Sequence, residues 1–369
     1  MAVELLTFDP DGDLLLRLPY PAEKAKGERT KRGNVGAKTL ADDATRDRME
    51  GTMTPEEGAH DLTDESGSPR EIQMLVSSKH LMLSSSVFRA MLQHSNFKEG
   101  DELRRSGKAE VVLPDDDYVA FGIMMNIIHG RVSKIPRKLS LDIMTKLAIL
   151  VDKYETLAVF GLVLDVWMPP LTNKIPKFFN KDVLPWLAIA WVFRLPDLFR
   201  KMTKLLLTEG DGVIAERLRP DLPIPNWVFD EIEIRRQGAI KSAVGHIETF
   251  FSDCRSPVGI CDSEIPQVQL ACNGIMLGTF LRSASSNNMW PIPEFPYTGL
   301  KLAEVTDAIL NLTITAVCGN SFENVKYQGR RIRSIQTSES HSVDERLADA
   351  MSDIHQSLSG LDLDFLSAP

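Results

Sequence analysis

The segment from Val76 to Leu92 constrains the fold of this chain most, because a strand-like start runs directly into an amphipathic helix. The serines at 84–86 can offer hydroxyl oxygens to the unpaired N–H groups of a new helix. Apolar residues then recur at helical spacing, at Val87, Phe88, Met91 and Leu92. One face of this helix must be buried, which favours a docking scaffold over a catalytic loop.

Three short strands are predicted around this helix. The first covers Asp13 to Leu18, between a turn at residues 9–12 and Pro19, which has no backbone N–H to donate. The second covers residues 71–76 and alternates apolar with polar residues, and the third covers residues 109–113. A calcium loop at residues 9–13 is the alternative to the turn, but the glutamate that such a loop needs at its twelfth position is missing.

Residues 21–70 form a long charged insertion between the first two strands. The segment has no aromatic residue, and its only large apolar side chains are Val35, Leu40, Met49, Met53 and Leu62. So little apolar surface cannot offset the entropy lost on ordering, which predicts disorder. The insertion is either a tolerated surface loop or a segment that binds a regulatory partner or targets the protein.

Two further helices complete the first domain, which is expected to end at residue 168. Asp115–Asp117 are predicted to cap a helix that ends before Gly130, although the three carboxylates could also hold a cation. The apolar face of this helix carries Phe121, Met124, Met125 and Ile128. A second helix is predicted from Ser140 to Tyr154.

The consecutive prolines Pro169 and Pro170 predict a boundary, because they favour an extended connector over regular helix. We therefore expect a linker at 169–180 and a mostly helical second domain at 181–333. A flexible tail at 334–369 is expected to carry one amphipathic helix, at 343–358, with a capping box at Ser342–Glu345. This helix either packs on its own domain or docks in a groove of another protein.

The order of these elements resembles the BTB (POZ) fold, and in particular fungal BTB-domain proteins of unknown biochemical function. The resemblance is carried by five phrases in the family's order, at residues 13–18, 76–92, 110–117, 125–131 and 147–154. Two features depart from the family's pattern: the insertion at 21–70 and the order Lys79-His80 in place of the usual His-Lys pair. The expected fold is therefore α+β, a BTB/POZ domain with a short mixed sheet flanked by helices, followed by a mostly α-helical second domain.

Membership of this family implies homodimers or higher assemblies and, in many members, docking to a cullin of a ubiquitin ligase. The positions expected to act as scaffold or partner contacts are Leu83, Phe88, Met91, Leu92, Phe121, Met124 and Met125. Helical periodicity alone does not separate core positions from interface positions among them.

The formal charge of −9 disfavours direct nucleic-acid binding, which needs a local excess of Lys and Arg. One basic segment, residues 326–333, is either a solvated turn or a nucleic-acid or nuclear-import element. The N-terminus has no signal-like pattern, and no apolar run approaches the roughly 20 residues that span a bilayer. We therefore expect a protein of the cytoplasm, the nucleus or both.

Catalytic signatures are sparse in this sequence. His80 and His129 are candidate general bases, but no nucleophile or acid partner lies near either in sequence. Phosphate-binding, metalloprotease and nucleophile-elbow motifs do not occur. We expect no catalytic residues.

The cysteines suggest a cofactor alternative. Cys254, Cys261, Cys272 and Cys318 could supply four thiolates to a structural zinc, although they lack the usual C-x2-C spacing. Ordinary free thiols, with no cofactor bound, are the favoured interpretation, because free cysteine is itself a common core residue.

The sequence thus favours a non-enzymatic interaction adaptor that self-associates and recruits partners, with substrate-adaptor work for a cullin ligase as an extension. Two alternatives stay open. One is a nuclear co-regulator that self-associates without touching DNA, and the other is an enzyme concealed in residues 175–330.

Overall fold

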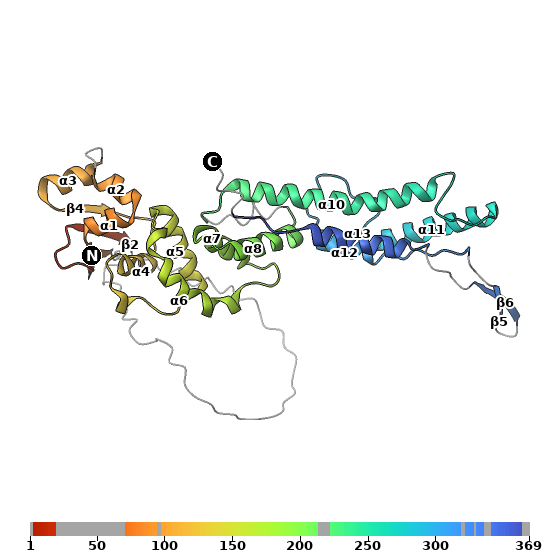
Figure 1. The fold of residues 1–369 in the computed structure, drawn as a ribbon, viewed down its shortest axis with the longest axis horizontal. Coiled ribbons are helices and arrows are strands. Elements are labelled where there is room, and N and C mark those ends of the chain that lie inside the picture. Colours follow the sequence, from red (N-terminus) through yellow and green to blue (C-terminus); the bar gives the residue numbers. More distant parts are fainter. Residues whose placement is uncertain are drawn as a thin grey trace, which may run out of the picture. The chain divides into compact units, whose positions relative to one another are not determined.

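The computed structural model describes residues 3–19, 71–93, 97–212, 222–318, 322–327, 330–335 and 341–363 (Figure 1). The chain is an α+β protein with one small mixed sheet and many helices. It divides into two compact units, residues 1–136 with 154–159, and residues 137–153 with 160–369. The predicted insertion at 21–70 lies outside the described residues.

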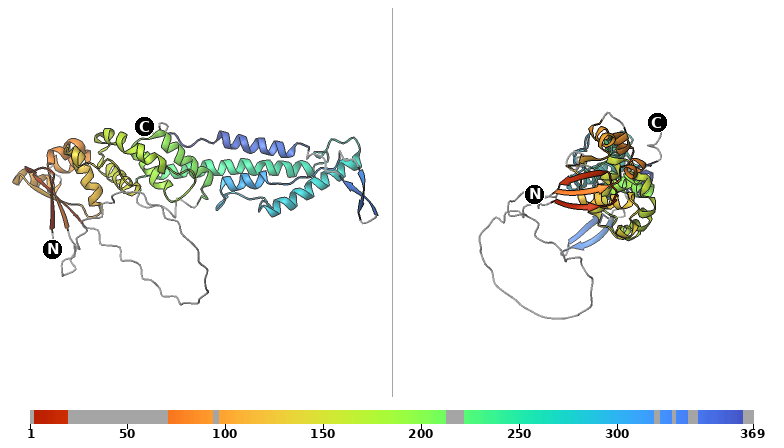
Figure 2. Two further views of the ribbon diagram at one scale, coloured as in Figure 1. Left: turned by 90° about the horizontal axis from the view of Figure 1, so that it is seen from below. Right: turned by 90° about the vertical axis from the view of Figure 1, so that its left-hand side faces the viewer.

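The sheet of the first unit has the strand order β1-β3-β2-β4, with mixed directions (Figure 2). The strands are β1 (Val3–Thr7), β2 (Leu14–Pro19), β3 (Glu71–Val76) and β4 (Ala109–Val112). β3 pairs antiparallel with β2 and parallel with β1, and β4 pairs parallel with β2. Three of these strands were predicted, whereas β1 was missed.

Alternation sets the register of the central strands. On β2, Leu14, Leu16 and Leu18 are buried, and on β3 the buried positions also fall at every second residue. The predicted turn before β2 is confirmed, because the backbone N–H of Gly12 donates to the carbonyl of Asp9. A side chain at Gly12 would lie 2.8 Å from the backbone oxygen of Val76, so the sheet approaches this turn too closely for any other residue.

The helices of the first unit follow the predicted cap chemistry. They are α1 (Ser78–Ser84), α2 (Ser86–Gln93), α3 (Lys98–Ser106) and α4 (Tyr118–Ile128), with short 3₁₀ turns η1 (Val132–Lys134) and η2 (Leu157–Val159). The hydroxyl of Ser85 accepts from the N–H of Phe88, at the start of α2. The carboxylate of Asp117 accepts from two backbone N–H groups of α4, which confirms the acidic cap.

The second unit is mostly helical, as expected. Its helices are α5 (Leu141–Tyr154), α6 (Gly161–Leu171), α7 (Val183–Val192), α8 (Pro196–Glu209), α10 (Asn226–Arg255), α11 (Pro266–Ser286), α12 (Leu302–Leu310) and α13 (Val343–Ser357), with a 3₁₀ turn η3 (Thr172–Lys174). The last residue of α5, Tyr154, belongs to the first unit.

The expected boundary at residue 169 differs from the structure. Pro169 and Pro170 lie in the last turn of α6, and the backbone N–H of Thr172 bonds back to the carbonyls of Met168 and Pro169. The prolines remove donors there, but their fixed φ fits helical geometry, so the helix continues to Leu171. The compact units divide the chain earlier, near residue 136, because α5 and α6 group with the later helices.

The tail helix α13 packs back on its own unit, against α10 and α12, in agreement with one of the two alternatives (Figure 2). Val343, Leu347, Met351 and Ile354 are buried with residues of those helices. The predicted capping box is wrong: Ser342 makes no side-chain cap bond and has a left-handed backbone. The tail is also not a flexible appendage throughout, because Leu361 and Leu363 are buried.

The basic segment at 326–333 is not a simple turn. Its described residues, 326, 327 and 330–333, lie on two antiparallel strands, β5 (Phe322–Tyr327) and β6 (Arg330–Ile335), which form a separate two-stranded sheet. Residues 334 and 335, at the start of the predicted flexible tail, lie in β6, and residues 336–340 lie outside the described residues.

Candidate metal centre

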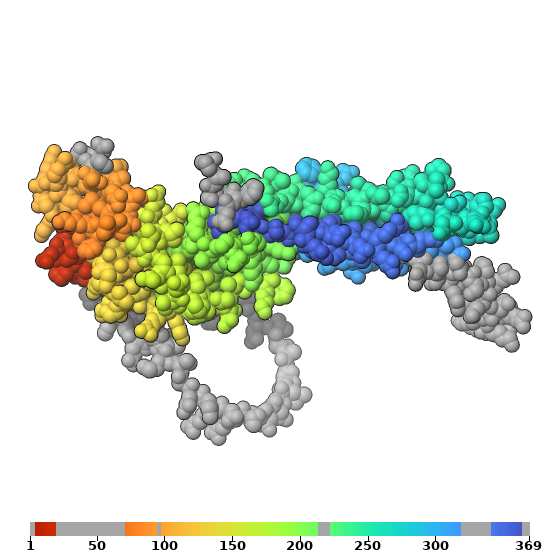
Figure 3. Space-filling view, in the orientation of Figure 1, coloured from red at the N-terminus to blue at the C-terminus, as the bar shows by residue number. Residues whose placement is uncertain are grey.

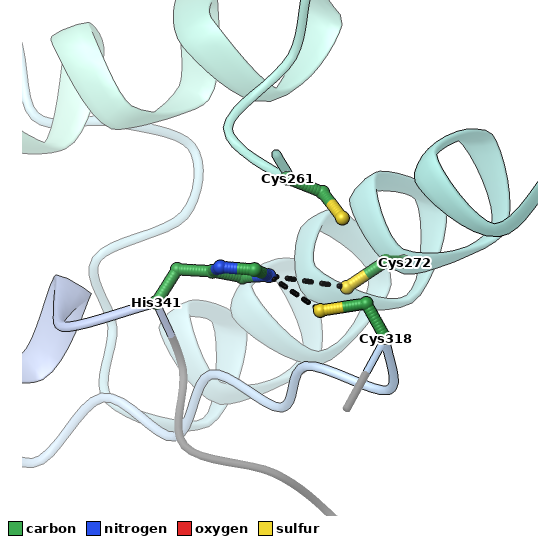
Figure 4. Close-up of side chains that lie close together, drawn as sticks. All are labelled: Cys261, Cys272, Cys318 and His341. Atoms are coloured by element: carbon green, nitrogen blue, oxygen red, sulfur yellow. Dashed lines mark hydrogen bonds between the residues drawn. The ribbon is translucent and has the colours of Figure 1, made fainter. Parts of the chain in front are cut away.

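Four potential metal ligands converge in the second unit: Cys261, Cys272, Cys318 and His341 (Figure 4). One ligand atom from each residue lies within 4.8 Å of the other three. They come from four separate segments: the loop between α10 and α11, the α11 helix, the stretch after α12, and the residue pair before α13. The site thus exists only in the folded unit.

The loop that carries Cys261 is fixed by side chains of α11. The Oδ1 atom of Asn273 accepts from the backbone N–H groups of Ile260 and Cys261, both at 3.0 Å. The side-chain amide of Gln269 donates to the carbonyl of Cys261 at 2.8 Å. Gly259 has a φ of +70°, and its α-carbon faces the amide of Asn273 so closely that an added Cβ would lie 1.8 Å from Nδ2.

The other three ligands contact one another directly. The Nε2 atom of His341 lies 2.9 Å from the sulfur of Cys318 and 3.6 Å from the sulfur of Cys272 (Figure 4). The backbone N–H of Val317 donates to the sulfur of Cys272 at 3.3 Å. The carboxylate of Asp262 lies 3.7 Å from Nδ1 of His341. A carboxylate beside the second ring nitrogen is a common way to orient a metal-binding histidine.

The pKa of the Cys318 thiol shows how a bound cation would change its protonation. Burial, together with hydrogen bonds to Cys261 and Cys272, raises the pKa of the Cys318 thiol to about 12. That thiol is therefore protonated at neutral pH while no cation is present. A bound cation reverses this preference, because its charge stabilises coordinating thiolates.

The structure corrects the predicted ligand set at one position. Cys254 lies on α10, buried in the apolar core, outside the cluster. Burial first, and the nearby Asp253 second, raise the pKa of its thiol to about 11. His341 is the fourth potential ligand in the cluster. The sequence offered one usable signal, the presence of a histidine at position 341, since three cysteines and one histidine are a known ligand set of structural zinc.

The four side chains of this cluster would fill the coordination sphere of a tetrahedral metal ion. All four donors come from the protein, and at least two of them, Cys261 and Cys272, are buried. Such a set could hold a metal ion without an open position for substrate. It is suited to structure and not to catalysis.

The predicted contact positions in the first unit separate into core and surface. Phe88, Leu92, Phe121, Met124 and Met125 are buried. They are core residues, so the structure excludes them as exposed contacts of this unit. Met91 is half-buried, and Leu83 is 79% exposed.

The two candidate general bases in the first unit lie side by side, with ring centroids of His80 and His129 5.1 Å apart. The Nε2 atom of His129 accepts from the backbone N–H of Ser77 at 3.0 Å, and Nδ1 lies 2.9 Å from the carbonyl of Met125. Both ring nitrogens of His129 therefore bond to backbone. Its role is to join α4 to the start of α1.

Comparison with known proteins gives no match to a family model, a curated protein or a solved structure. Within the described residues, no helix combines the length and apolarity needed to cross a membrane. The BTB resemblance therefore stays a hypothesis.

Proposed function

We propose that this chain is a non-enzymatic interaction adaptor whose first unit is a BTB-type module that binds protein partners. The support is the resemblance in sequence, together with a small mixed sheet and an α1–α2 helical hairpin in the expected order. Self-association and recruitment of a partner are the expected activities, with a cullin as the partner to test first.

One observation carries the proposal: Leu83 is an exposed apolar residue on a rigid support. It lies in the last turn of α1, where the guanidinium of Arg89 donates to the carbonyls of Met82 and Leu83. The side chain is 79% exposed, although it lies between the buried Leu81 and the buried Ser85. A large apolar residue held in a fixed position loses little conformational entropy on binding, which is what a docking anchor requires.

The test compares substitutions at two residues of similar exposure, made in the full chain. Leu83→Asp should weaken self-association or capture of a purified cullin by at least about tenfold, since a buried charge would be unpaired at the interface. Val132→Asp is the matched control, because Val132 is 75% exposed in the same unit. Light scattering gives the mass of the assembly, and a pull-down gives cullin binding. If the two variants have the same assembly mass and the same cullin binding, the role of Leu83 is refuted. A wild-type chain that is monomeric and does not bind the cullin would refute the adaptor proposal.

We also propose that the cluster of Cys261, Cys272, Cys318 and His341 binds zinc. Three sulfurs and one imidazole are a donor set of structural zinc, and soft sulfur ligands disfavour magnesium and calcium. Tetrahedral zinc places its ligand atoms about 3.3–3.8 Å apart. The four ligand atoms lie within 4.8 Å of one another, so zinc binding would draw the widest pairs together and lengthen the 2.9 Å separation between Nε2 of His341 and the sulfur of Cys318.

Metal analysis of the purified full chain tests this site. We expect about one zinc per chain, lost in Cys272→Ala and kept in Cys254→Ala, which removes a buried thiol outside the cluster. A zinc-free wild type, or equal loss in both variants, would contradict the assignment.

A further inference from the structure

The ligand His341 lies two residues before the tail helix α13, and this junction has an unusual backbone. His341 and Ser342 both have positive φ, at 56° and 55°. Neither is a glycine, so each pays a steric cost in the left-handed region. Consecutive strained residues persist only where the surrounding structure holds them, and such strain clusters at functional sites.

The two ends of α13 are held differently. Near its C-terminal end, His355 bonds through Nε2 to the hydroxyl of Thr306 on α12 at 3.1 Å. Beyond the helix, the backbone N–H of Leu361 donates to the hydroxyl of Thr203 on α8 at 2.8 Å, and Asp362 pairs with Arg200. This end is joined to α12 and α8 whatever the state of the cysteines.

The N-terminal end adjoins the metal ligands and a hollow. A hollow of about 130 Å³ lies between α10 and the first turns of α13, lined by His246, Phe250, Val343 and Leu347 among others. Figure 3 shows α13, in blue, lying along the surface of the unit beside α10. Larger hollows, of about 330 and 460 Å³, lie along the middle and C-terminal half of α13, so packing does not single out either end. What distinguishes the N-terminal end is that His341 contacts Cys272 and Cys318 directly before the helix begins.

We infer that zinc acts as a clasp that docks the N-terminal half of α13 onto α10. This inference rests on the zinc site proposed above. The Zn–N bond to His341 fixes the strained junction, and the apolar side chains of Val343 and Leu347 then stay in the core. Without the ion, relief of the strain favours release of this end, whereas the contacts of His355 and Leu361 keep the C-terminal half in place.

Hydrogen exchange of the full chain, read by mass spectrometry, tests the clasp. Zinc-loaded protein is compared with protein treated with a chelator under reducing conditions. We expect amides of residues 343–350 to exchange at least about tenfold faster without zinc, with little change at residues 354–363 and in α8. His341→Asn should give the same pattern in the presence of zinc, because asparagine tolerates the left-handed backbone but removes the imidazole ligand.

The backbone strain is tested separately with serine variants. Ser342→Gly removes one left-handed penalty, so in zinc-free protein it should slow exchange at residues 343–350 by roughly tenfold. Ser352→Gly is the control: Ser352 is exposed in the middle of α13, where glycine weakens a helix and exchange should speed up.

The outcomes separate the two proposals. Stoichiometric zinc with unchanged exchange at residues 343–350 after its removal would overturn the clasp and leave the zinc site standing. Loss of protection throughout α10, α11 and α13 would also overturn it, since the ion would then hold the whole unit. Absence of zinc from the wild type would remove both proposals.

Discussion

Replacement of Gly259 by alanine is expected to damage the second unit at the loop that carries Cys261. The added Cβ would lie 1.8 Å from Nδ2 of Asn273, so the amide must move. Two backbone hydrogen bonds to its Oδ1 atom, each worth about 0.5–1.5 kcal/mol, would be lost. The φ of +70° adds about 1–2 kcal/mol for a residue with a Cβ. We expect the free energy of unfolding to fall by about 2–5 kcal/mol.

The control for this prediction is Gly274→Ala on the adjacent helix α11, where an added Cβ meets no atom within 4 Å. Alanine there should stabilise the helix by about 0.5–1 kcal/mol. Urea unfolding gives the free energies, and competition with a chromophoric chelator gives the zinc affinity, which should fall only in Gly259→Ala. Unfolding of Gly259→Ala within about 0.5 kcal/mol of the wild type, with zinc affinity unchanged, would refute this account of the loop.

Three further predictions concern other contacts. Tyr154→Phe removes the buried hydroxyl that donates to Asp116 but keeps the ring stacked on Phe88. Urea unfolding should therefore show a loss of about 1.5–3 kcal/mol in the free energy of unfolding, and an unchanged value would contradict the prediction. Gly360→Ala should cost about 1–3 kcal/mol in thermal unfolding, because its Cβ would lie 1.7 Å from a backbone oxygen of α8; an unchanged midpoint would contradict it. Stability should also fall as the pH drops below 6.5, and His129→Gln should remove most of this loss in urea titrations at two pH values; an equal loss in the wild type and the variant would contradict it.

The sign of that pH dependence follows from the His129 imidazole. Burial lowers its pKa below the ordinary 6.5, with His80 and Arg131 acting in the same direction and the Met125 carbonyl and Asp9 opposing. The unfolded state therefore binds the proton more readily, and stability is lost as pH falls through 6.5. The Glu71 carboxylate adds a separate, more acidic window, because the hydrogen bond from Arg17 lowers its pKa below 4.5.

Local physical chemistry made much of the fold predictable. A turn and a terminal proline located β2, alternation located β3, and apolar spacing of three and four located α4 and α5. The acidic run at residues 115–117 predicted the cap of α4 correctly because a cap depends on neighbours in the chain. Each of these signals is confined to one element.

The errors share a cause. Ser342 and Glu345 have the spacing of a capping box, yet the left-handed backbone at Ser342 moves its hydroxyl away from the helix. Pro169 and Pro170 suggest a break, yet they occupy a last turn that tolerates missing donors. In both places the residue type alone did not fix the local backbone conformation.

What the sequence determined by itself was most of the helices and the strands β2, β3 and β4, and that four cysteines were available as metal ligands. Only the tertiary structure decided which donors meet, placing Cys254 in a core and His341 beside Cys318. It also decided that Phe88 is core whereas Leu83 faces solvent. The physical reason is that periodicity reports which face of a helix is apolar, whereas contacts between distant segments depend on how those faces pack.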